Sequence, residues 1–79
     1  MNHPNLQVHE EVRVATLSQR EREVLALLAE GFSSKEIANT LNIAPGTASV
    51  HVMRIYEKLG VNKAVAAVRV AIRCGLVAA

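Results

Sequence analysis

The chain has 79 residues, a formal net charge of +2 and one cysteine. A chain of this length forms one small domain, and a single cysteine excludes a disulfide framework and a zinc site built on cysteines. Its apolar runs fall short of the roughly 18 residues of a membrane span, and its N-terminus lacks an apolar signal core. We expect a cytoplasmic protein with no membrane segment, metal or cofactor.

The positive charge belongs to the larger, C-terminal part of the chain. Residues 1–16 have a net charge of −1, and residues 17–79 have +3. This balance permits phosphate binding without requiring it. The chain has no glycine-rich phosphate loop, strand pattern or paired carboxylates, and Cys74 and His51 fall on different predicted helices with no orienting group. We therefore do not expect an enzyme.

Residues 1–16 predict an N-terminal arm or linker. Pro4 comes early, and only a weak alternation of apolar residues follows, so we expect at most a short ordered stretch over residues 12–15. His3 and His9 have no further ligand nearby at a useful spacing, which favours a solvated tail over a metal site.

Residues 17–79 predict an all-α domain. Ser18 and Ser33 each begin a Ser-x-x-Glu capping box, which satisfies two backbone donors at a helix start. Glycines that favour the left-handed conformation end the helices. The mixed-sign residues 20–23 are expected to form a solvated face. The architecture is a four-helix bundle with a central helix-turn-helix, and its helices span residues 18–30, 34–41, 45–59 and 63–74.

The stretch 34–53 is the helix-turn-helix candidate. The helix over residues 45–59 has one narrow apolar stripe at helical spacing, formed by Ala48, Val52, Ile55 and Leu59. Its opposite face is small and polar near the start, as suits insertion into the DNA major groove. That face comprises Gly46, Ser49, Val50, Met53 and Glu57, flanked by Thr47 and Arg54. By periodicity alone, an ordinary surface helix fits equally well.

Several motifs in combination resemble the LuxR/FixJ-type (NarL-like) DNA-binding domain over residues 17–76. They are Leu17-Ser-Gln-Arg-Glu-Arg-Glu-Val-Leu25, Gly31-Phe-Ser-Ser-Lys-Glu-Ile-Ala38, Leu41-Asn-Ile43, Thr47, His51, Ile55, Lys58-Leu59-Gly60-Val61 and Gly75-Leu76. The resemblance implies the output domain of a bacterial transcription regulator, such as a response regulator or signal-sensing protein. It also implies double-stranded DNA as the partner, a homodimer, and RNA polymerase as a further partner.

The resemblance also implies roles for individual residues. Lys35 and Thr47 would hold phosphates, Arg54 and Lys58 would lie along the DNA backbone, and the base-facing positions would be Ser49, Val50 and Met53. The chain departs from the family pattern at Ser49, where the family usually has lysine, and at Met53, where some members have lysine. Lys63-Ala64 replaces the usual Asn-Arg pair. Fewer cations predict weaker DNA binding.

The last predicted helix has two apolar stripes. Ala64, Ala67 and Ala71 are expected to face the bundle, which leaves a second stripe of Val65, Val68 and Ile72 for a weak homodimer. Two alternative functions remain. Region 4 of a sigma factor shares part of the motif cadence, although the last helix and the Gly75-Leu76 ending argue against it. A protein-interaction module could keep this fold after losing DNA binding.

Overall fold

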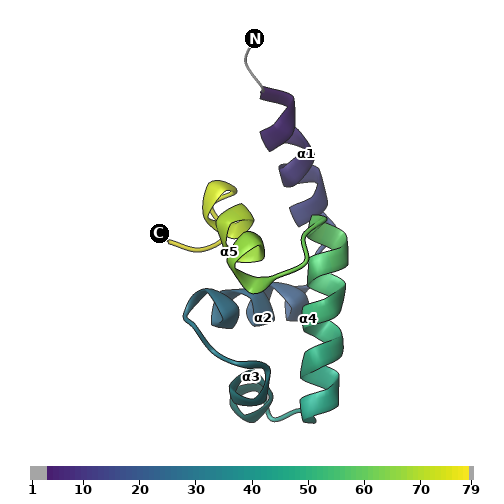
Figure 1. The fold of residues 1–79 in the computed structure, drawn as a ribbon, viewed down its shortest axis with the longest axis vertical. Helices are drawn as coiled ribbons and strands as arrows, with labels where there is room; N and C mark the ends of the chain where they lie inside the picture. The colour runs from purple at the N-terminus through teal and green to yellow at the C-terminus, as the bar shows by residue number, and fades with distance from the viewer. Residues whose placement is uncertain (1–3, 79) are drawn as a thin grey trace.

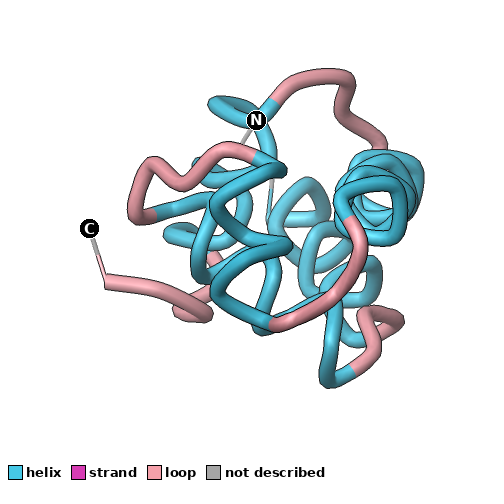
Figure 2. The backbone as a smooth tube through the Cα atoms, turned by 90° about the horizontal axis from the view of Figure 1, so that it is seen from below, coloured by secondary structure: helices cyan, strands magenta, loops and turns pink. Residues whose placement is uncertain are grey.

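The computed structural model describes residues 4–78, and their side chains from residue 9 onward. Within that range the backbone forms five helices and no strand (Figures 1 and 2). The helices are α1 (Pro4–Ala15), α2 (Gln19–Ala29), α3 (Ser34–Leu41), α4 (Pro45–Leu59) and α5 (Ala64–Arg73). The all-α prediction is confirmed, and α2 to α5 match the four predicted helices to within one residue at each end. None of the described helices is both long and apolar enough to span a bilayer.

Helix α1 corrects the sequence analysis, which predicted an arm or linker with order only near residues 12–15. The arm is helical from Pro4 to Ala15 and packs against α4 and α5. Its anchor is Val14, which is buried in the core. This anchor exists only once the other helices are assembled, so local propensity could not reveal it. His9 is exposed, His3 lies outside the described residues, and the described residues contain no group that could hold a metal ion.

The predicted capping boxes are present. At the start of α2, the Glu21 amide donates to Ser18 Oγ at 3.1 Å, and the Ser18 amide donates to Glu21 Oε1 at 2.9 Å. At the start of α3, the equivalent distances between Ser33 and Glu36 are 3.1 and 2.8 Å. Each box satisfies two backbone donors that would otherwise lack a partner, so the two helix starts are fixed locally.

Helix α4 is the centre of the fold. It is in contact with α1, α2, α3 and α5. Its predicted apolar stripe is buried, as the small exposures of Ala48, Val52, Ile55 and Leu59 show. Burial of such a stripe, at roughly 25 cal/mol per Å² of apolar surface, holds the helix in the bundle.

The inner face of α5 differs slightly from the prediction. Ala67 and Ala71 are buried as expected, but Ala64 is only half-buried. Val70 completes the buried face instead. Since successive residues turn by about 100°, Val70 lies beside Ala67 on the helix, so the face is rotated away from Ala64.

Two glycines offer a test of the contact between α1 and the end of α4. Gly60 and Gly31 both have positive φ, +69° and +89°. A side chain at Gly31 would meet nothing, whereas one at Gly60 would occupy the position of Arg13 Nη1. Gly31→Ala should therefore cost roughly 1–2 kcal/mol of backbone strain. Gly60→Ala should cost about 0.5–1.5 kcal/mol more, because it displaces the Arg13 hydrogen bond to the end of α4.

Urea unfolding of the two variants measures this difference. In an Arg13→Met background the excess cost of Gly60→Ala should vanish. Equal losses for both glycines in the native background would show that Arg13 does not occupy this position in solution.

Candidate nucleic-acid interface

Three residues separate α3 from α4. Asn42 ends α3 in the left-handed conformation with φ 57°, which asparagine tolerates better than most residues. The Ile43 amide then donates to the Ala38 carbonyl at 3.0 Å. Ala44 is extended and Pro45 begins α4, where its fixed φ suits the first helical position. The turn is therefore short and well defined, and it joins two helices in the helix-turn-helix arrangement.

The face of α4 opposite its buried stripe is open. Val50 and Met53 are 46% and 62% exposed, although both are apolar. Thr47, Ser49 and Arg54 are exposed as well. Within the part of the chain whose side chains are described, no hydrogen bond or ion pair engages the side chains of these five residues. The predicted reading residues of α4 therefore share one outward face and are available for an external partner.

Lys35 lies in the first turn of α3 and is exposed. Its neighbour Glu36 accepts hydrogen bonds at the helix start, and the backbone and side-chain bonds with Ser33 lower the pKa of that carboxyl. Glu36 is therefore anionic at neutral pH, and it reduces the positive potential near Lys35. Lys35 remains a candidate phosphate contact in a nearly neutral setting.

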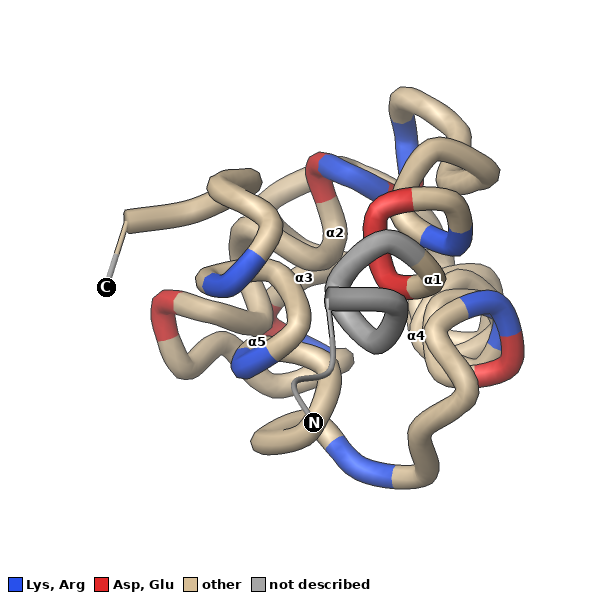
Figure 3. Tube along the Cα trace, turned by 90° about the horizontal axis from the view of Figure 1, so that it is seen from above, with Lys and Arg blue, Asp and Glu red and all other residues tan. Residues whose placement is uncertain are grey.

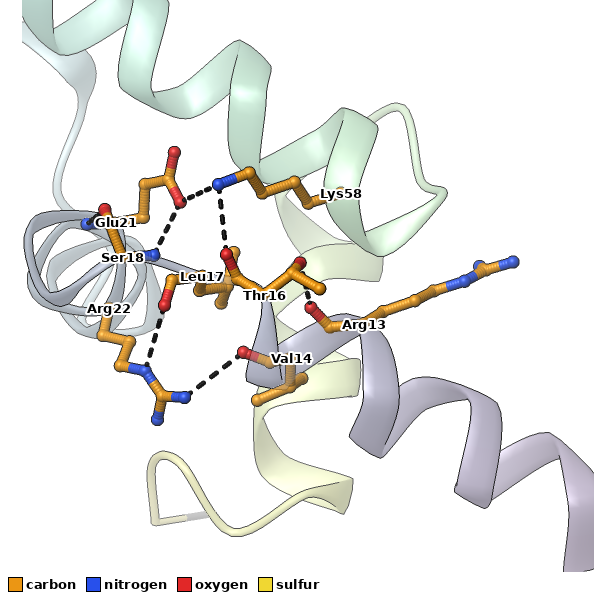
Figure 4. A network of polar contacts seen from close by, with 8 residues as sticks. All are labelled: Arg13, Val14, Thr16, Leu17, Ser18, Glu21, Arg22 and Lys58. Carbon is orange, nitrogen blue, oxygen red and sulfur yellow. Dashed lines mark hydrogen bonds and ion pairs between the residues drawn. The ribbon is translucent and has the colours of Figure 1, made fainter.

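Lys58 has a different role from the one predicted. Lys58 Nζ donates to Glu21 Oε1 at 2.7 Å and to the Thr16 carbonyl at 3.1 Å (Figure 4). Glu21, expected on a solvated face, is only 4% exposed. The ammonium group of Lys58 is thus engaged inside the protein, so we remove Lys58 from the proposed DNA contacts. It connects the C-terminal end of α4 to the start of α2.

The corner between α1 and α2 contains further contacts that the sequence did not reveal. Arg22 donates to the carbonyls of Leu17 and Val14, at 3.5 and 3.4 Å (Figure 4). Arg13 Nη1 donates to the Leu59 carbonyl at 3.2 Å. The only local signal for the Arg13 contact was Gly60, which follows α4. A glycine at that position does not indicate which side chain will lie over it.

The predicted dimer stripe on α5 is only partly free. Val65 is 58% exposed and Ile72 is 38% exposed. Val68 is half-buried at the edge of the core. The surface available to a second copy is therefore smaller than the sequence predicted and is centred on Val65 and Ile72.

The Glu21–Lys58 pair predicts how acid affects stability. Burial raises the pKa of Glu21, but hydrogen bonds from Lys58 and Ser18 lower it by more, so the net pKa lies below the ordinary 4.5. A carboxyl with a depressed folded pKa stabilises the fold above its unfolded pKa, and this contribution disappears as the pH falls through the folded value. The thermal midpoint should stay level from neutral pH to about pH 5 and fall below that.

Lys58→Met removes the partner and leaves the burial, so the folded pKa of Glu21 should rise. The thermal midpoint of this variant should therefore be lower than that of wild type at neutral pH, and the difference should narrow as the pH falls below about 5. The matched control is Arg20→Met, which removes the same charge from the exposed Arg20–Glu23 pair and should follow wild type at every pH. Thermal unfolding followed by circular dichroism at a series of pH values measures both. A difference in thermal midpoint between wild type and Lys58→Met that stays constant down to acid pH would contradict the assignment.

A comparison with known protein families identifies the family to which this helix-turn-helix chain is similar. The family described as bacterial regulatory proteins, luxR family (GerE), matches residues 15–71. The match covers α2, α3, α4 and most of α5, and it leaves out nearly all of α1. Members of this family contain a helix-turn-helix domain that binds DNA and regulates transcription. The domain is not an enzyme. The chain belongs to the LuxR family of bacterial regulatory proteins.

Proposed function

We propose that the chain binds duplex DNA by inserting the N-terminal half of α4 into the major groove. The observation that carries the proposal is the division of α4 into a buried stripe and an open face without internal partners. In helix-turn-helix proteins the residues near the start of the second helix contact base edges. The open face of α4 lies at that end of the helix, next to the turn.

The roles of the residues follow from their chemistry and position. Ser49 Oγ can donate to or accept from a base edge, and the methyl groups of Val50 can pack on a thymine methyl. Met53 extends the apolar part of this surface. Lys35, Thr47 and Arg54 flank the base-facing residues and would hold the phosphates on either side, which fixes the register of the protein on the duplex.

The charge on this surface is low. Lys35 and Arg54 are the two cations of α3 and α4 with no internal partner among the described residues, since Lys58 is paired. Figure 3 shows Lys and Arg interspersed with Glu along the backbone rather than gathered on one side. Phosphate neutralisation supplies most non-specific affinity, so we expect weak binding to random DNA.

The proposal also includes the cellular role of the chain and its partners. As the output domain of a response regulator or a signal-sensing protein, the chain would act in the cytoplasm on a promoter. RNA polymerase is the additional partner that an activator requires there. A homodimer through α5 would bind two half-sites about one DNA turn apart. The remaining alternative is a protein-interaction module, which the low charge on α4 favours.

Ser49→Lys and Lys35→Ala test the placement of α4. Ser49→Lys should raise the affinity for any duplex and steepen the dependence of log K on log salt by about one unit, because it adds one phosphate contact. Lys35→Ala should weaken binding about equally for specific and random duplexes and should reduce the slope by a similar amount. Fluorescence anisotropy at several salt concentrations measures both, with a duplex selected from a random pool by the wild-type chain.

Two outcomes would contradict the proposal. Unchanged binding by Ser49→Lys would mean that α4 does not lie in the groove. Failure of the wild-type chain to select any duplex at low salt would favour the interaction module.

Val65→Asp tests the dimer. Val65 is exposed, so a charge there should leave the circular dichroism spectrum unchanged, abolish concentration-dependent mass and reduce cooperative binding to a two-site duplex. The matched control is Val12→Asp on α1, since Val12 is 61% exposed and Val65 is 58% exposed. Analytical ultracentrifugation over a concentration series measures the mass. Equal behaviour of the two variants would place the dimer contact elsewhere or exclude it.

A further inference from the structure

Helix α1 is attached to the rest of the domain by contacts of three kinds. Val14 is buried in the core. Arg13 Nη1 donates to the Leu59 carbonyl at 3.2 Å. Glu10 accepts two hydrogen bonds from Arg73, from Nε at 2.9 Å and from Nη2 at 2.6 Å. The two polar contacts lie at the C-terminal ends of α4 and α5, so α1 joins the two helix ends.

The Arg13 contact suits the end of a helix. The last carbonyls of a helix have no partner within it, and the helix dipole favours a cation there. Leu59 is the last residue of α4, and Gly60 follows in the left-handed conformation. The guanidinium of Arg13 lies over Gly60, in the space where a Cβ would stand. The absence of a side chain at Gly60 therefore allows α1 to approach α4 closely.

The Glu10–Arg73 pair resists separation. Glu10 is 8% exposed, and its hydrogen bonds with Arg73 outweigh the effect of burial and hold the pKa of the carboxyl below its ordinary value. Loss of Arg73 would leave a buried carboxylate without its main partner, which is more costly than the loss of an exposed pair. The bidentate geometry also fixes the direction from which the two helices meet.

The position of α1 matters because α4 is a single straight element. Figure 1 shows α1 at one end of the long axis, and α3 with the N-terminal end of α4 at the other. The 15 residues of α4 span about 22 Å at roughly 1.5 Å per residue. A tilt of about 10° at the C-terminal end of α4, where α1 is docked, would shift its N-terminal end by about 4 Å. This shift is more than a hydrogen bond to a base edge tolerates.

We propose that Arg13 and Glu10 are positioning residues for DNA recognition: by docking α1 on the ends of α4 and α5, they set the angle at which α4 meets the groove. This inference rests on the proposed function. Arg13 lies outside the region matched to the luxR family, and so do Glu10 and Arg73. The apolar stripe of α4 keeps the helix in the bundle without these contacts, so their loss should alter recognition more than folding.

Arg13→Met is the main test, and Arg20→Met is its matched control. Both remove one positive charge, but the exposed pair of Arg20 with Glu23 lies within α2. Arg13→Met should lower the affinity for the selected duplex by up to about tenfold, the upper end of what one ordinary hydrogen bond contributes. The slope of log K against log salt should match that of wild type, since no phosphate contact is removed. Arg20→Met should bind as wild type does.

A charge exchange tests the second contact. Glu10→Arg and Arg73→Glu should each weaken binding, because like charges then face one another, and the double variant should recover most of the loss. Circular dichroism and thermal unfolding establish that each variant is folded. Should Arg13→Met fail to fold, Glu10→Gln tests the same docking of α1, with the same expectations of lower affinity and an unchanged slope.

The outcomes separate this inference from the proposed function. Binding by the folded α1 variants within twofold of wild type, or additive losses in the charge exchange, would overturn the positioning role and leave DNA binding intact. A reduced salt slope for Arg13→Met would also overturn it, because Arg13 would then contact phosphate directly. No selected duplex for the wild-type chain would overturn both.

Discussion

The apolar stripe of α4 must be buried, and the arrangement of the other helices follows from that requirement. All four of them pack against α4. Burial of each large aliphatic side chain contributes about 1.5–3 kcal/mol, more than the roughly 0.5–1.5 kcal/mol of an ordinary hydrogen bond. Apolar packing has no preferred direction, whereas hydrogen bonds do. The stripe therefore holds α4 in the bundle, and the polar contacts of Leu59 and Lys58 join its C-terminal end to α1 and α2. Because the stripe is narrow, the opposite face stays open next to the turn.

The distribution of cations follows the same division. Five of the nine Lys and Arg residues have a hydrogen-bond partner within the domain, namely Arg13, Arg20, Arg22, Lys58 and Arg73. Most of these join the ends of helices at the α1 side of the molecule. The cations without an internal partner in the described part of the chain are Lys35, Arg54, Lys63 and Arg69. Positive charge is thus used to assemble the domain, and net charge alone overstates what is available to phosphates.

Local signals in the sequence predicted α2 to α5 and the buried stripe of α4. Capping boxes and glycine stops act within a few residues, and a stripe depends only on the helical period. What could not be predicted depends on long-range pairs. Glu10 and Arg73 are 63 residues apart, and Glu21 and Lys58 are 37 apart. Such pairs form only after the helices assemble. The sequence alone therefore predicted a linker where α1 forms, and a cation available to DNA at Lys58. The exposed residues of α4 were predictable because they lie on the side of the helix opposite the buried stripe.

If α4 lies in the major groove as proposed, the small number of cations on its open face lowers affinity for DNA in general and increases the share of binding that depends on sequence. Phosphate contacts strengthen binding to every sequence, so a smaller number of them lowers non-specific affinity, while contacts to base edges discriminate between sequences. A single domain would then bind weakly, and a dimer through α5 would add a second half-site. Docked α1 does not block that surface, because Arg73 lies about 80–100° around the helix from Val65 and Ile72. One edge of α5 is therefore occupied by α1 through Glu10, and the other remains open for a second copy, so the orientation of α4 and the pairing of two domains can be set independently.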